Sequence, residues 1–183
     1  VAFGYLTATV TVLDPDPSIA YALAVTDFGA SSTFSFLFST PIVATGSPNV
    51  VGASLQGTLT DATGDGVGLA LVGSAVQTAA VNTLTSLGVD LGTAALHAGT
   101  TQPPPLGYAY GPFSAGPIAG PGPGPWTSLL VQASFTLSGA GDSASLTGAA
   151  SINEEPHSVP EPGLMALLAA GLGAMLGHRR RAH

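Results

Sequence analysis

Three oxygen-bearing side chains at alternating positions are the first residues in this chain that could bind a metal ion. Asp61, Thr63 and Asp65 precede Gly66. Calcium loops place oxygen ligands at positions one, three and five in this way, but an EF-hand also needs an acidic residue at position twelve, where this chain has Val72. We therefore favour a plain Asp/Gly turn, and a looser Ca²⁺ loop formed by Asp61, Thr63 and Asp65 is the alternative.

Two short motifs resemble parts of hydrolase active sites but lack the partners that catalysis needs. Gly141-Asp142-Ser143 is similar to the nucleophile block of one esterase family, which requires Leu next and an Asp with a nearby His towards the C-terminus. Ala144 follows here, and His157 has no Asp near it. Glu154 and Glu155 are adjacent, so their side chains point apart on an extended chain and cannot work as an acid–base pair. We predict that the chain is not an enzyme.

The remaining metal-binding and nucleophilic residue types are scarce. The chain contains no Cys, which excludes disulfides, thiolate metal sites and a Cys nucleophile. His97 is isolated from any carboxylate at ligand spacing, so we interpret it as a solvated loop residue. No cofactor is predicted apart from the possible Ca²⁺.

The charge distribution excludes one large class of partner. Charged residues make up 7% of the chain, and all ten Asp and Glu residues precede its three Lys or Arg residues, which are Arg179, Arg180 and Arg181. The body therefore carries no Lys or Arg that could neutralise a phosphate backbone. Nucleic-acid binding is excluded.

Aromatic side chains gather in a segment rich in Pro and Gly. Residues 101–126 hold eight Pro and six Gly, which predicts a long irregular loop because Pro removes ladder donors and Gly weakens strands. Tyr108, Tyr110 and Trp126 lie in this segment and could stack on sugar rings. The competing interpretation is that Trp126 anchors the loop to the core.

The elements that must position these residues are short strands. Hydrophobic and small polar residues alternate with period two in several segments, the clearest of which contains Phe34, Phe36 and Phe38. The other segments predicted as strands are 5–13, 19–25, 50–60, 67–72, 88–91, 129–137 and 144–152. Residues 1–153 are therefore predicted to be mainly β and to form an antiparallel β-sandwich, with a closed β-barrel as the alternative.

The C-terminal segment has three parts in a fixed order. Residues 154–163 are a linker that contains Pro160-Glu161-Pro162, residues 164–177 are apolar, and residues 178–183 contain the Arg cluster. A helix over 164–177 would be about 21 Å long, short of a bilayer core of about 30 Å. Because basic residues stay in the cytoplasm and snorkelling Arg side chains absorb such a mismatch, we predict a transmembrane helix with the body exported. The alternative is an apolar helix packed on the body.

The Arg cluster sets the predicted topology. Arg179, Arg180 and Arg181 would hold the chain end in the cytoplasm, on the opposite side of the membrane from the body. They would act as a topological stop and have no part in chemistry.

This order resembles the PEP-CTERM sorting signal. The resemblance covers residues 159–181 and implies that Pro160, Glu161 and Pro162 are recognised by the membrane enzyme exosortase. It further implies an exopolysaccharide-producing Gram-negative bacterium, a transient anchor in the inner membrane, and cleavage near the motif. The body also resembles uncharacterised passenger domains of that family in Phe34-Ser35-Phe36 and Gly88-Val89-Asp90.

Together these features predict an exported surface or extracellular-matrix protein. Its body would be structural or adhesive in a biofilm, and the alternative is a carbohydrate-binding module that contacts exopolysaccharide through the loop aromatics. The chain begins Val1-Ala2-Phe3, without Met, a basic region or an apolar core. Since the tail requires export, we expect a removed signal peptide rather than a fragment.

Overall fold

A computed structural model describes residues 5–14, 17–42, 49–82, 85–120 and 126–154. No helix in this part of the chain is long and apolar enough to span a membrane.

The predicted C-terminal sorting segment lies outside the described residues. This applies to the motif Pro160, Glu161 and Pro162, to the helix predicted over 164–177, and to the basic residues Arg179, Arg180 and Arg181. His157 also lies outside them. The predicted roles of these residues in sorting and topology therefore stay predictions.

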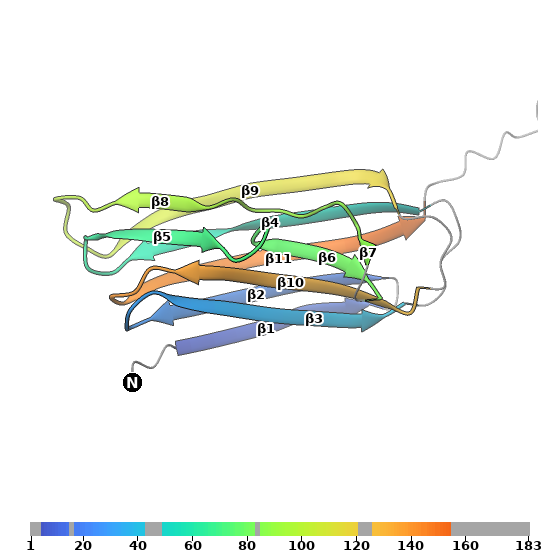
Figure 1. The fold of residues 1–183 in the computed structure, drawn as a ribbon, viewed down its shortest axis with the longest axis horizontal. Coiled ribbons are helices and arrows are strands. Elements are labelled where there is room, and N and C mark those ends of the chain that lie inside the picture. Colours follow the sequence, from blue (N-terminus) through green and yellow to red (C-terminus); the bar gives the residue numbers. More distant parts are fainter. Residues whose placement is uncertain (1–4, 15–16, 43–48, 83–84, 121–125, 155–183) are drawn as a thin grey trace, which may run out of the picture.

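The described residues form eleven strands and no helix, arranged in two antiparallel sheets (Figure 1). The five strands of sheet A run in the order β1 (Tyr5–Asp14), β2 (Ser18–Asp27), β11 (Asp142–Glu154), β4 (Asn49–Asp61) and β9 (Leu106–Ala119). The strands of sheet B run in the order β7 (Thr85–Ser86), β6 (Gln77–Val81), β10 (Ser128–Leu137), β5 (Gly66–Leu71) and β8 (Ala95–Ala98), and β3 (Ser32–Pro41) also pairs with β10. The prediction of a mainly β fold with two antiparallel sheets is confirmed. The sheets are not closed into a barrel, so that alternative is wrong.

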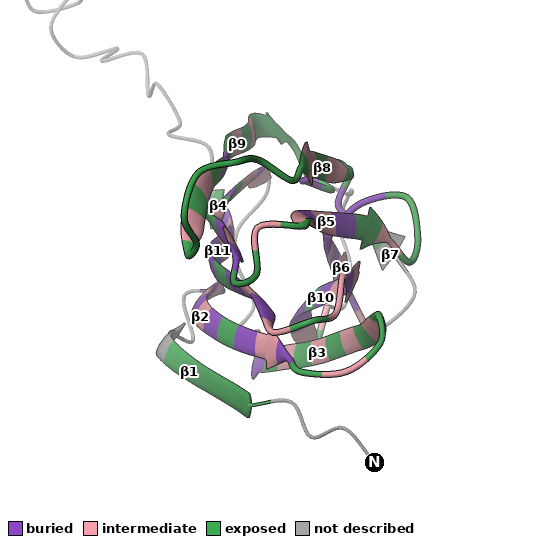
Figure 2. Cartoon of the chain, turned by 90° about the vertical axis from the view of Figure 1, so that its left-hand side faces the viewer, coloured by how far each residue is buried: buried purple, intermediate pink, exposed green. Residues whose placement is uncertain are grey.

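The core lies between the two sheets, because alternate side chains on most strands point inward. In β2 the buried hydrophobic residues are Ile19, Tyr21, Leu23 and Val25, and in β10 they include Leu129, Val131, Ala133, Phe135 and Leu137. Seen end-on, buried segments line the inside and exposed segments the outside (Figure 2). Small or polar residues, among them Ser, Thr and Ala, occupy most of the alternating positions on the outer faces, and an antiparallel sheet needs only one buried face.

One hydrogen-bonded bridge of polar side chains crosses the core between the two sheets. The Tyr21 hydroxyl donates a hydrogen bond of 2.7 Å to Oε1 of Gln77, whose Nε2 donates to the Ala149 carbonyl at 3.1 Å. Gln77 is fully buried, so leaving it unpaired would cost about 1–3 kcal/mol. Burial also raises the pKa of Tyr21. This bridge fixes one sheet relative to the other.

The three Phe residues of β3 lie on one face, as predicted. Phe34, Phe36 and Phe38 are half-buried and pack against the core. Phe38 stacks on Tyr21 with ring centroids 4.7 Å apart, and the ring centroids of Phe34 and Phe135 are 5.9 Å apart. Since β3 is bonded to β10 alone, its inner face lies at the margin of the core.

The loop predicted over residues 101–126 is wrong for most of its length. Fourteen of these residues form β9, which pairs with β4 at the edge of sheet A. Two register shifts accommodate the prolines: Gly111-Pro112 lies opposite Gln56, and Gly116-Pro117 lies opposite Gly52. Each is a bulge in which two residues face one, and an edge strand tolerates Pro at such positions because no ladder bond is lost.

The strand predicted at residues 88–91 is also wrong. Only Leu91 forms a bridge, to Gln77, although Val89 and Leu91 are buried. Gly88 and Gly92 have φ angles of 72° and 89°, which interrupt an extended conformation. The alternation there reflects burial of an irregular segment.

Candidate functional site

Three carboxylates meet at one end of the two sheets, and we call them the acidic cluster. Asp61 is the last residue of β4, Asp65 lies in the turn that leads to β5, and Asp142 is the first residue of β11. One oxygen atom from each lies within 4.8 Å of the other two. β11 pairs directly with β4, with Ser143 opposite Thr60, so the ends of these strands bring Asp142 beside Asp61.

Asp61 is held by the backbone of its own turn. Its Oδ1 accepts hydrogen bonds from the N–H groups of Thr63 and Gly64, at 3.1 and 2.6 Å, and its Oδ2 accepts one from Gly66 at 2.9 Å. The side chain is fully buried. Both oxygens therefore accept hydrogen bonds within an Asp/Gly turn, and the choice between a plain turn and a Ca²⁺ loop stays a prediction.

Asp142 links this turn to sheet B. Its Oδ1 accepts the Ala62 N–H at 3.2 Å and its Oδ2 accepts the Ser138 hydroxyl at 2.5 Å, while Ser138 Oγ in turn accepts the Gly68 N–H at 2.7 Å. Burial raises the pKa of Asp142; the bonds from Ser138 and Ala62 lower it, and the charges of Asp61 and Asp65 raise it further. The neutral form of Asp142 is thus favoured relative to an exposed Asp.

The structure places all three predicted calcium ligands in one turn. Asp61 and Asp65 belong to the acidic cluster, whereas the Thr63 hydroxyl donates a hydrogen bond to Asp65 and its N–H donates to Asp61. Asp142 joins them as a third carboxylate. Sequence reasoning missed it because the only local signal, the turn before Asp142, says nothing about which strand lies beside β11.

Two chemical solutions can balance the charge of the acidic cluster. One is a proton on Asp142, which burial favours. The other is a hard cation such as Ca²⁺, which binds carboxylate oxygens. The chain has no Lys and no Arg before residue 179. Within residues 1–178, therefore, no Lys or Arg side chain can neutralise these carboxylates instead.

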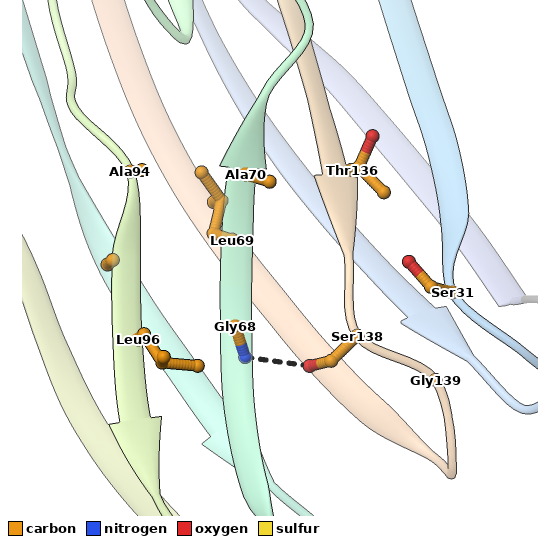
Figure 3. A pocket seen from close by; sticks show the side chains of 10 residues that line it. Ser31, Gly68, Leu69, Ala70, Ala94, Leu96, Thr136, Ser138 and Gly139 are labelled. Carbon is orange, nitrogen blue, oxygen red and sulfur yellow. Dashed lines mark hydrogen bonds between the residues drawn. The ribbon is translucent and has the colours of Figure 1, made fainter.

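A groove of about 470 Å³ lies on the outer face of sheet B beside the acidic cluster. Figure 3 shows Leu96 and Ala70 on neighbouring strands, Thr136 beyond them, and the bond from Gly68 to Ser138 at one end. None of the lining residues has a titratable side chain. The Ser138 hydroxyl is committed to Asp142, so this groove offers no acid, base or activated nucleophile.

The aromatics proposed for glycan contact do not present free rings. Tyr110 is 3% exposed and donates a hydrogen bond of 2.7 Å to the Thr93 carbonyl, and burial raises its pKa to about 12. Tyr108 stacks on His97 with ring centroids 4.2 Å apart. Trp126 packs against the core, as the competing interpretation expected. Burial therefore removes Tyr110 from the predicted contact set.

His97 differs from its interpretation as a loop residue. It lies in β8, and its ring is parallel to that of Tyr108 within 9°. No local pattern in the sequence signals this contact, because β8 and β9 belong to different sheets.

The comparisons with known proteins leave the family open. No protein-family model and no curated protein sequence matches this chain. One solved structure, that of the infectious bursal disease virus Gx strain, aligns with 86% of this chain at 16% identity and a TM-score of 0.28. The chain spans about a third (33%) of that viral chain, and a score this low supports no conclusion about fold or function.

Proposed function

We propose that this chain is an exported, exosortase-processed surface or extracellular-matrix protein of a Gram-negative bacterium. The observation that carries the proposal is the order of three C-terminal segments: Pro160-Glu161-Pro162, the apolar residues 164–177, and the cluster of Arg179, Arg180 and Arg181. A basic cluster after an apolar segment retains the chain end in the cytoplasm. The apolar segment is then a transient anchor, and cleavage near the motif releases the body from the inner membrane.

The body is a non-catalytic β-sandwich with a structural or adhesive role in an exopolysaccharide matrix. Its support comes from the acidic cluster, where Asp61 and Asp142 are occupied by turn and strand contacts. The groove beside it has no titratable lining residue. A purely acidic body also resists attachment to anionic surfaces by charge alone, so contacts in the matrix rest on hydrogen bonds and apolar packing.

Intact-mass analysis of the protein purified from its native host tests the sorting proposal. We expect the mature protein to lack residues 164–183 and a variant with Pro160→Ala, Glu161→Ala and Pro162→Ala to retain them. Pro156→Ala is the matched control, because it removes a proline from the same linker outside the motif.

Two outcomes would contradict the proposal. One is a mature parent that still ends at His183, and the other is processing of the triple variant equal to that of the Pro156→Ala control. A host without exosortase should leave both proteins uncleaved, which separates enzymatic processing from spontaneous proteolysis.

A further inference from the structure

The first strand of sheet A has an unpaired outer edge. β1 pairs with β2 from Tyr5↔Thr26 to Asp14↔Ser18, and no described residue pairs with its other side. Figure 2 shows β1 at the outside of the molecule, exposed where it is coloured green. A strand in this position presents a row of free N–H and C=O groups to any chain that approaches.

Both faces of residues 5–10 are exposed as well as their edge. Tyr5, Leu6 and Val10 are 66%, 52% and 41% exposed, and together they account for three of the eight large hydrophobic residues exposed on the described surface. The register places Leu6 opposite Val25 and Ala8 opposite Leu23, and both partners are buried. The apolar face of β1 therefore continues the core face of sheet A beyond the point where the core ends.

Residues 5–10 of β1 also lack the usual features that protect an edge from pairing, because the one register shift of β1 lies further along, between Val10 and Val12. Residues 5–13 contain no charged residue, no Pro and no Gly, and they are rich in Thr, Val, Leu and Tyr. These residue types have high β-propensity, and no charged residue or Pro is present to discourage pairing with another strand. The opposite edge, β9, carries two Gly-Pro bulges.

We propose that β1 is a homodimer interface in which a second copy adds its own β1 to this edge, so that the two five-stranded sheets become continuous. Antiparallel pairing about a two-fold axis at Ala8 places Leu6 opposite Val10 of the copy and Thr7 opposite Thr9. Apolar residues then meet apolar residues on one face, and Thr residues meet on the other. A two-fold interface requires this self-complementarity.

Charge favours a second copy over a different partner. The formal net charge of the chain is −7, so two copies repel one another over most of their surfaces. Residues 5–13 carry none of that charge and form an edge where copies can approach without repulsion. A basic partner would gain nothing at β1 and would be drawn to the acidic residues elsewhere.

The dimer should be weak and reversible. One strand of ten residues is well below the roughly 20–30 residues per partner found in standard interfaces. We therefore expect a dissociation constant on the order of micromolar. This inference does not depend on the proposed sorting function.

Sedimentation velocity of the full-length chain over a range of concentrations tests the proposal through charge exchange. Leu6→Lys/Val10→Lys places like charges opposite each other in the homodimer, and Leu6→Glu/Val10→Glu does the same with negative charges. Each variant alone should raise the dissociation constant at least about tenfold. Mixing the two variants should restore a heterodimer.

The matched control is Leu37→Lys/Leu96→Lys, because these residues are 65% and 83% exposed and lie on sheet B. It should associate like the parent. The apolar segment 164–177 is present in the parent and in all variants, so any association through it affects them equally. The test therefore compares the dissociation constant of each variant with that of the parent. A monomeric parent, an unchanged Lys variant, or a Lys/Glu mixture that stays monomeric would each overturn the proposal.

Cysteine cross-linking gives a second test, since the chain has no Cys of its own. Ala8→Cys places a thiol at the proposed two-fold axis, whereas Ala109→Cys places one at an exposed position on β9. Under mild oxidation we expect the Ala8→Cys dimer to accumulate at least about tenfold faster, because pairing holds the two thiols close together. Equal rates for the two variants would contradict pairing at β1.

Discussion

The two edge strands of sheet A, β9 and β1, differ in their Gly and Pro content and in whether their inner faces are buried. β9 is interrupted by Gly111-Pro112 and Gly116-Pro117, yet it buries Tyr110 and packs Phe113 against the core. β1 has an uninterrupted β-forming sequence, yet residues 5–10 are all exposed. Strand propensity and burial are therefore independent properties of an edge. A strand interrupted by Gly-Pro pairs can belong to the core while a strand without them extends beyond it.

This difference suggests a division of roles between the edges. Bulges and prolines interrupt the row of ladder groups on β9, so no further strand can pair along its full length. β1 keeps that row intact from Tyr5 to Val10, before its register shift between Val10 and Val12. We expect β9 to contribute to the stability of the monomer and β1 to contribute to association.

The largest expected effect is at Tyr110. Tyr110→Ala removes a buried ring whose centroid lies 5.0 Å from that of Phe113, and it should lower the free energy of unfolding by about 3–5 kcal/mol, as for other large aromatics in cores. Tyr5→Ala, on the exposed edge, should change it by no more than about 0.5 kcal/mol in a monomeric background. Each variant is combined with Leu6→Lys/Val10→Lys to keep the protein monomeric. Urea denaturation then measures the free energy of unfolding of each. Equal losses would mean that the two edges do not differ in this way.

A smaller effect is expected at the bulges of β9. Gly116 has a φ of 92°, and a Cβ at this position would lie 2.2 Å from the Val51 carbonyl oxygen. Gly116→Ala should therefore cost about 1–3 kcal/mol through backbone strain and displacement of β9. Gly73→Ala is the control, because a Cβ there meets nothing within 4 Å.

The same denaturation experiment measures both glycine variants. If Gly116→Ala were as stable as Gly73→Ala, the bulge would not be a fixed feature of the edge. Amide hydrogen exchange along β9 would then locate any shift in its pairing with β4.

The smallest effect concerns pH, and it separates the β9 side of sheet A from β1. The acidic cluster lies at the end of β4, the partner of β9, whereas residues 5–13 of β1 contain no carboxylate. Because burial raises the pKa of Asp142, folding favours its protonated form. Its stabilising contribution is complete below the unfolded pKa of about 3.9 and is lost as the pH rises through the folded pKa. Asp142→Asn should therefore flatten the dependence of stability on pH above about 4.

Thermal melts at several pH values, with and without EDTA, check this prediction. A parent whose pH dependence equals that of Asp142→Asn would contradict it. EDTA should leave the melting temperature of the parent unchanged, as should Asp65→Ala, if residues 61–66 are a plain turn. A melting temperature that falls with EDTA in the parent but not in Asp65→Ala would instead assign Ca²⁺ to the acidic cluster.

Local sequence pattern is sufficient to predict several of the strands and to locate the positive charge. Period-two alternation in residues 19–25, 129–137 and 144–152 predicted β2, β10 and β11, because the pattern is local and each strand buries one face. The Asp/Gly turn at residues 61–66 could also be predicted from the sequence, because Asp61 accepts hydrogen bonds from N–H groups within five residues of itself. Its agreement with the structure reflects short-range hydrogen bonding.

Which strands are neighbours could not be predicted from local pattern and is seen in the folded chain. The order β2-β11-β4-β9 brings Asp142 to Asp61, lays β9 beside β4 so that a segment rich in Pro and Gly becomes an edge strand, and buries Tyr110. These contacts join residues that are far apart in the chain, and alternation within a strand does not specify its partners. The choice follows from packing two apolar faces into one core, which depends on all of the strands at once.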